Sequence, residues 1–178
     1  NGFFEKHIAE GIASSIDENK YYFLSKKPGK EDAETIATRF FEKESQWESD
    51  LFFIGHWEPN TEKFIKAIIN ANLPITVRGP GWSRSSINSE VVKSEWFYGP
   101  QYVEAINSGK IGLGFVSKWN RNETAGRCFE IPACGTMLLA LRTSVLEGLY
   151  EEGKEAEFFI SPQELIEKAK FYLNNPNE

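Results

Sequence analysis

From residue 50 onward, short apolar runs alternate with amphipathic stretches. The first run, Leu-Phe-Phe-Ile-Gly at 51–55, has the length and continuity typical of a strand that is buried on both faces of a parallel sheet. The stretch that follows has Pro59 at its start and apolar residues at helical spacing (Phe64, Ile65, Ile68 and Ile69). Strands that alternate with helices predict an α/β domain, a Rossmann-like parallel sheet with helices on both faces and right-handed connections.

The same alternation continues to the end of the chain. We expect further strands at 74–78, 96–98, 110–117, 136–141 and 157–160, and helices at 100–107, 123–133 and 161–173. The last helix has a capping pattern, Ser161 followed three residues later by Glu164. Residues 1–49 are polar with one amphipathic run at 31–47, so we interpret them as a linker and helical lead-in to a single domain at 50–178.

Composition narrows the class of protein. The chain has 178 residues, of which 40% are hydrophobic, enough for one sizeable core but not for two full α/β domains. No apolar run approaches the roughly 20 residues that span a bilayer, so we expect no membrane span.

Cys128 and Cys134 lack the spacing of a disulfide framework or zinc site, and we interpret them as small buried hydrophobes. Without a disulfide pattern, a cytoplasmic location is the default expectation. Because the first residue is Asn1, we expect a fragment of a longer chain.

Charge is unevenly distributed. The net charge of −6 opposes non-specific nucleic-acid binding, which depends on neutralising phosphates. Between residues 74 and 142, eight basic and five acidic residues give +3, so the remainder carries −9. A locally basic middle suits a small anion better than a polymer, although scattered charges could equally be solubilising surface.

Ligands of parallel sheets bind at the carboxyl ends of the strands. The expected loops there are 55–59, 78–84, 98–100, 117–124 and 142–144. Three of them carry arginine or lysine and two are rich in glycine, which predicts a ligand that contains phosphate. The loop at 79–84 begins like a dinucleotide fingerprint but lacks the third glycine, and a tight turn explains it as well.

The segment at 117–135 is more informative. A loop rich in basic and amide side chains runs directly into an expected helix start, so cations and the positive helix end meet at one place, which favours a diphosphate. Arg127 and Glu130 are three residues apart and share a helix face. They could form an intrahelical ion pair, or Glu130 could accept hydrogen bonds from a ribose diol, as acidic residues do in nucleotide-binding folds.

These motifs carry a family resemblance. The segments concerned are 50–59, 78–82, 113–115 and above all the Arg-Cys-Phe-Glu-Ile-Pro-Ala-Cys-Gly block at 127–135, with an opening Asn1-Gly2-Phe3 and His7 like a linker. Nearly the whole chain resembles the C-terminal half of family 1-type glycosyltransferases of the spore-maturation-protein group. The resemblance implies the donor-binding domain of a two-domain (GT-B-type) enzyme, whose acceptor domain lies in a missing N-terminal part of the same chain. A nucleotide-diphosphate sugar would then be a co-substrate, with no cofactor.

The resemblance also implies roles for single residues. Glu130 would hold the ribose hydroxyls, Arg127 with Lys118 would neutralise the diphosphate, and Gly55 would allow close approach of the donor. The Tyr98-Gly99 turn would contact the base, and Arg78 and Arg121, from the basic loops, complete the expected donor-binding set.

Related retaining enzymes carry two glutamates that flank seven residues, and the second matches Glu130. Here the first position falls on Asn122, with Glu123 one place later. Glu123 is therefore the candidate catalytic acid of the resemblance. His56, just after the first strand, is a second candidate, although a lone histidine is more often structural.

The chain contains three aspartates, Asp17, Asp32 and Asp50, so it lacks the closely spaced aspartates that hold a metal in the other common glycosyltransferase architecture. We therefore expect no metal ligands and a leaving diphosphate stabilised by cationic side chains and the helix end. Two alternatives stay open: a non-catalytic nucleotide- or carbohydrate-binding module of the same fold, and a generic flavodoxin-like interaction domain. On the first hypothesis this piece binds a donor of a hexose-type sugar but does not transfer it alone.

Overall fold

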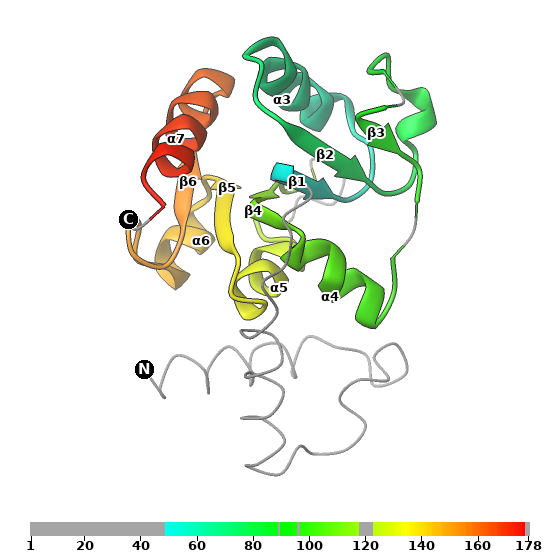
Figure 1. Cartoon of the computed structure of the whole chain (residues 1–178). Coiled ribbons are helices and arrows are strands. Elements are labelled where there is room, and N and C mark those ends of the chain that lie inside the picture. Colours follow the sequence, from blue (N-terminus) through cyan, green and yellow to red (C-terminus); the bar gives the residue numbers. More distant parts are fainter. Residues whose placement is uncertain (1–48, 89, 96, 118–122, 177–178) are drawn as a thin grey trace.

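The computed structural model describes residues 49–88, 90–95, 97–117 and 123–176. Within them, six strands form one parallel sheet in the order β3-β2-β1-β4-β5-β6 (Figure 1). The strands are β1 (Ser49–Ile54), β2 (Ile75–Arg78), β3 (Val92–Lys93), β4 (Gly109–Gly114), β5 (Met137–Leu141) and β6 (Glu157–Phe159). This is the expected α/β Rossmann-like fold.

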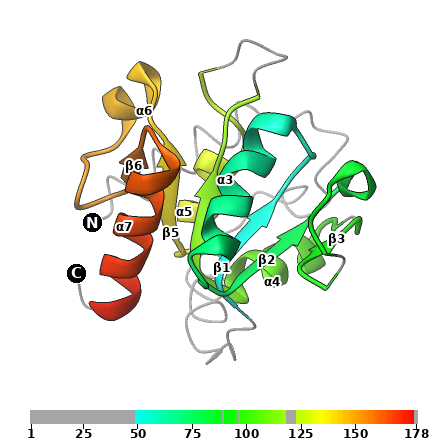
Figure 2. The ribbon, with the colours of Figure 1, turned by 90° about the horizontal axis from the view of Figure 1, so that it is seen from above.

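Helices cover both faces of the sheet. They are α3 (Pro59–Asn70), α4 (Pro100–Asn107), α5 (Arg127–Ala133), α6 (Ser144–Leu149) and α7 (Pro162–Asn174), with a short 3-10 helix η1 (Trp82–Arg84). Helices α3 and α7 lie on one face, and α4, α5 and α6 lie on the other (Figure 1). Seen from above, α3 and α7 cross in front of the strands (Figure 2).

The continuous apolar run of β1 has a direct structural reason. Successive side chains of a strand point to opposite faces, so Leu51 and Phe53 enter the core beneath α3 and α7, whereas Phe52 and Ile54 enter the core beneath α4, α5 and α6. All four are at most 8% exposed. A strand covered on both sides has no polar face, which is why the sequence shows no alternation here.

The ends of the long helices follow the sequence signals. Pro59 opens α3, as expected for a residue that lacks a backbone N–H. The Ser161 hydroxyl accepts a hydrogen bond from the Glu164 backbone N–H at 3.2 Å, and the Glu164 carboxylate accepts one from the Ile160 N–H at 2.8 Å. The capping pattern predicted for α7 is therefore confirmed.

The order of the strands reverses between β1 and β4. Strand β1 pairs with β2 on one side and with β4 on the other, so the connections that leave these two strands diverge. In open α/β sheets the crevice at the carboxyl ends of such a strand pair is where ligands bind. Gly55 follows the carboxyl end of β1, and residues 115–117 follow the carboxyl end of β4.

The expected strand at 96–98 is wrong. The third strand is β3, where Val92 pairs with Val77, and the described residues Phe97 and Tyr98 lie in the loop before α4. Val92, which pairs with β2, is buried at 7% exposure, whereas Tyr98 is 68% exposed. Pairing with β2 therefore decides where the third strand lies. Aromatic residues favour strands as a class, but here they belong to a connection.

Other boundaries differ from the prediction. The helix expected at 123–133 begins only at Arg127, and the strand expected at 110–117 ends at Gly114. Helix α6 was not predicted, because its six residues are too short to show a helical period, although Thr143 caps it. The lead-in at 1–48, including the run at 31–47, lies outside the described residues, so the domain boundary at 49/50 stays a prediction.

Two further expectations concern single features. Cys128 is fully buried and Cys134 half-buried, and both are free thiols. Burial raises the pKa of both, that of Cys134 to about 11. Among the described residues, no helix is both long and apolar enough to cross a bilayer.

We expect Leu139→Ala to lower the free energy of unfolding by about 2–5 kcal/mol, because it opens a cavity around a fully buried residue at the centre of β5. Urea unfolding measures this change. The matched control is Ile160→Ala, at a side chain that is 70% exposed, which we expect to change stability by less than about 0.5 kcal/mol. Equal losses in the two variants would contradict the assigned core.

Candidate functional site

The loops that follow β1 and β2 touch through their glycines. The Gly55 N–H donates a hydrogen bond to the Arg78 carbonyl at 2.8 Å. A Cβ atom on Gly79 would lie 2.3 Å from the Gly55 carbonyl oxygen, and Gly79 has a φ of 132°. Glycine is therefore needed at 79 by backbone packing, which supports the turn interpretation of the Gly-Pro-Gly segment over a dinucleotide fingerprint.

Two tryptophans form further hydrogen bonds between the same two loops. The indole N–H of Trp82, a residue only 3% exposed, donates to the Gly55 carbonyl at 2.8 Å. The backbone N–H of Trp57 donates to the Pro80 carbonyl at 2.9 Å. The carboxyl ends of β1 and β2 thus form one cross-linked unit, with Trp82 in the core.

Glu62 of α3 accepts hydrogen bonds from both of these loops. Its carboxylate, in a residue 7% exposed, accepts hydrogen bonds from the Trp57 indole and from the Ser86 backbone and hydroxyl, and pairs with Lys66 at 2.7 Å. Burial alone would raise the pKa of Glu62, but these donors and the lysine charge outweigh it and lower the pKa to about 2. Glu62 is therefore ionised at neutral pH and fastens both loops to α3.

Arg127 brings a positive charge to the end of β1. It is the first residue of α5, and its guanidinium lies against Gly55, where an added Cβ would be 2.8 Å from Nη2. The guanidinium carbon lies 5.6 Å from the centre of the Phe53 ring. Its Nε is buried without a hydrogen-bond partner among the described residues. The missing side chain of Gly55 makes this approach possible.

Glu130 lies one turn further along α5 and contacts α4. The Tyr102 hydroxyl donates to Glu130 Oε2 at 2.5 Å. Burial, the negative charge of Glu130 and the hydrogen bond raise the pKa of Tyr102, while Arg127 lowers it in part. The other carboxylate oxygen of Glu130 faces the backbone before α5, 3.1 Å from where a Cβ on Gly126 would be. Tyr102, Arg127 and Glu130 thus form one cluster.

Tyr102 also links this cluster to the turn before α4. Its backbone N–H donates to the Gly99 carbonyl at 3.1 Å, and Gly99 has a φ of 54°, which favours glycine. The expected base-contacting turn is therefore one helical turn from the residue that holds Glu130. Sequence reasoning missed Tyr102, because no spacing rule relates a residue of α4 to one of α5.

The structure distributes the predicted residues as follows. It brings Arg127 against Gly55 at the carboxyl end of β1 and Glu130 against Tyr102, and Gly99 joins them through Tyr102. Tyr98 and His56 are exposed. Lys118 and Arg121, like Asn122, lie outside the described residues.

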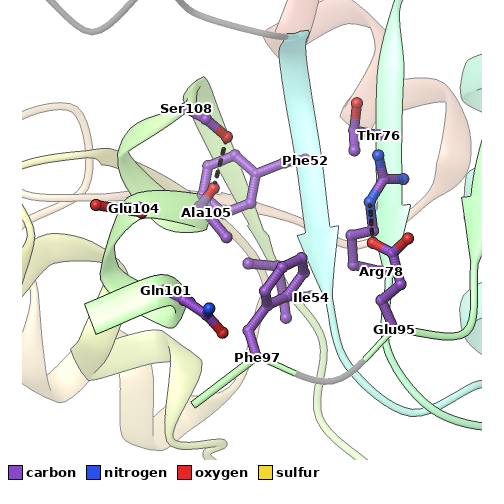
Figure 3. A pocket seen from close by; sticks show the side chains of 10 residues that line it. All are labelled: Phe52, Ile54, Thr76, Arg78, Glu95, Phe97, Gln101, Glu104, Ala105 and Ser108. Carbon is purple, nitrogen blue, oxygen red and sulfur yellow. Dashed lines mark hydrogen bonds and ion pairs between the residues drawn. The ribbon is translucent and has the colours of Figure 1, made fainter. Parts of the chain in front are cut away.

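Arg78 occupies a different place. Its Nε lies 3.4 Å from the Glu95 carboxylate, so much of its charge is already balanced. It lines a cavity of about 510 Å³ on the α4 side of the sheet (Figure 3). Phe52, Ile54 and Phe97 form the apolar part of that cavity, next to the expected base-contacting turn.

Glu123 is anchored by its backbone. The Thr143 hydroxyl donates to the Glu123 carbonyl at 2.7 Å and accepts from the Leu146 N–H at 3.2 Å, where it caps α6. The side chain of Glu123 is exposed. Of the residues that the structure describes, no three or more His, Cys, Asp and Glu are grouped as a metal site would need.

Comparison with protein families bears on this geometry. A family model described as glycosyl transferase-like matches residues 58–178, more than half of the chain. The chain belongs to the glycosyl transferase-like family. In this glycosyl transferase-like domain the match includes Tyr102, Arg127 and Glu130, and sugar transfer is the chemistry that the family name describes. A search of curated proteins gave no match.

We expect Gly79→Ala to cost roughly 2–4 kcal/mol of unfolding free energy, because the methyl group meets the Gly55 carbonyl and the backbone conformation is strained for an L residue. Chemical denaturation tests this. The control is Gly148→Ala in α6, where a Cβ meets open space and alanine favours the helix. A Gly79→Ala protein as stable as the control would contradict the described contact.

Glu62 predicts a pH dependence of stability. Its folded pKa of about 2 lies below the ordinary value of 4.5, so its contribution is fully present above about pH 4.5 and is lost as the pH falls toward 2. We expect wild type to be more stable than Glu62→Gln at pH 6 and this difference to shrink by pH 3. Urea midpoints at both pH values measure it, and a difference that does not change with pH would refute the assigned role.

Proposed function

We propose that this domain binds the nucleotide-diphosphate part of a sugar donor at the carboxyl ends of β1 and β4, as the donor-binding half of a GT-B-type glycosyltransferase. The observation that carries the proposal is the position of Arg127 against Gly55, with Glu130 beside it. A cation and a carboxylate at the reversal point of a parallel sheet match the two polar parts of a nucleoside diphosphate, its phosphates and its ribose hydroxyls.

Each polar group then has a role. The Arg127 guanidinium pairs with the diphosphate, Glu130 accepts the ribose hydroxyls, and the Tyr98-Gly99 turn contacts the base. Lys118 and Arg121 would add positive charge from the preceding loop. Arg78 has the weakest support as a donor-binding residue, because it already pairs with Glu95.

The same groups serve the chemistry. When the bond between the sugar and the diphosphate breaks, negative charge accumulates on the leaving phosphate oxygen, and a fixed guanidinium stabilises that charge without a metal. The helix end contributes less than the sequence suggested, because α5 has only seven residues and begins at Arg127 itself.

The residues that we assign to activation of the acceptor are exposed to solvent. His56 directly follows Gly55 at the end of β1, and the backbone carbonyl of Glu123 is held by Thr143, just after β5. Both side chains are exposed. We propose them as candidate catalytic residues, acting on an acceptor that an N-terminal domain of the same cytoplasmic enzyme supplies. The transferred group would be a hexose-type sugar.

A second candidate function is a binding module of the same fold without catalysis. Asn122 stands where related retaining enzymes carry their first glutamate, and this substitution favours the alternative. Both candidates share the nucleotide site. They differ in turnover, so a longer enzyme that contains this domain would be assayed with a panel of donor sugars, and binding without hydrolysis or transfer would favour the module.

We expect titration calorimetry of this chain with UDP and GDP to detect binding of at least one of them. Arg127→Ala and Glu130→Ala should each weaken it by about tenfold or more, because each removes a charge-assisted hydrogen-bond partner. The control is Lys154→Ala, which removes an exposed lysine paired with Glu151 in the turn before β6. If neither nucleotide binds, or if both site variants bind like the control, the proposed function is wrong.

A further inference from the structure

The Glu130 carboxylate accepts a hydrogen bond from the hydroxyl of Tyr102, which lies on the neighbouring helix α4. We propose that Tyr102 is a positioning residue: it fixes the Glu130 carboxylate toward the ribose diol and so makes the site select ribonucleotides over 2′-deoxyribonucleotides. This inference rests on the proposed function, in which Glu130 accepts the ribose hydroxyls.

The two oxygens of the Glu130 carboxylate have different surroundings. Oε2 accepts the Tyr102 hydroxyl at 2.5 Å, whereas Oε1 lies over the backbone at Gly126. A glutamate on a helix surface otherwise has three rotatable side-chain bonds and sweeps through many orientations. With one oxygen held, the rotation of the side chain is restricted, and a ligand does not have to order it when it binds.

The electrostatics keep the hydroxyl in its donor form. Burial and the adjacent negative charge of Glu130 raise the pKa of Tyr102, so the phenol stays protonated across the physiological range. Arg127 acts on the same hydroxyl, since it lowers that pKa in part. The phenol therefore interacts both with the residue assigned to the phosphates and with the residue assigned to the ribose.

A fixed acceptor gives selectivity that a mobile one does not. If the 2′-hydroxyl is missing, a held carboxylate loses one hydrogen bond and cannot turn to replace it with water. A carboxylate released from Tyr102 turns toward solvent and tolerates the deoxy ligand. Loss of the phenol should thus reduce discrimination more than it reduces affinity.

A simple brace between α4 and α5 is the competing role for Tyr102, and the protein provides a matched control. The Tyr150 hydroxyl donates to the Cys128 carbonyl at 2.8 Å, so it also holds α5 but does not touch Glu130. Tyr102→Phe and Tyr150→Phe each delete one phenol that fastens the same helix and keep the ring in place. A brace predicts that the two variants behave alike.

The experiment compares UDP with dUDP and GDP with dGDP by calorimetry on the full 178-residue chain. For the base that binds, we expect wild type and Tyr150→Phe to favour the ribonucleotide by about tenfold, the value of one hydrogen bond to a charged group. Tyr102→Phe should reduce this preference to about threefold or less. In a Glu130→Gln background, Tyr102→Phe should leave the ratio unchanged, because the two residues act as one unit.

The outcomes separate the inference from the proposed function. If wild type binds no nucleotide, the proposed function fails, and this inference fails with it. If wild type binds and discriminates but Tyr102→Phe keeps the full ratio, or weakens both ligands equally as Tyr150→Phe does, the positioning role is wrong and the donor site stands. If wild type binds the ribo and deoxy ligands equally, the selectivity is wrong.

Discussion

Gly55 is the residue on which the carboxyl edge of this sheet depends. Gly79 packs against its carbonyl, the Trp82 indole donates to that same carbonyl, and the Phe53 ring and the Arg127 guanidinium occupy the space where a Cβ would be. Two segments that are distant from Gly55 in sequence, the loop after β2 and the start of α5, therefore meet at this one residue. A strand buried on both faces delivers that residue to the reversal point of the sheet, so the core and the site are parts of one arrangement.

The sequence predicts those parts of the fold that local physics decides. Continuous apolar runs indicate β1 and β5 because both faces of these strands are covered, and proline and capping residues indicate where α3 and α7 begin. The third strand is different. Its two residues are selected by pairing with β2, a tertiary condition, while the nearby aromatic residues have the better intrinsic preference for a strand.

The candidate site shows the same division. Arg127 and Glu130 could be predicted as neighbours, because residues three apart share a helix face. That Arg127 reaches Gly55 and that Glu130 meets Tyr102 follows only from how α5 packs against β1 and α4. The partner of Arg78 could not be predicted either: Arg78 has the expected charge and strand end, and the fold places Glu95 3.4 Å from its Nε.

The Thr143 hydroxyl makes two hydrogen bonds that belong to different segments. One caps the first turn of α6, and the other holds the carbonyl of Glu123 in the segment between β4 and α5. Because one hydroxyl makes both, the position of the Glu123 backbone and the stability of α6 are thermodynamically linked. A ligand that fixes the backbone at Glu123 therefore also stabilises a helix that it does not touch, and the effect passes through a single oxygen atom.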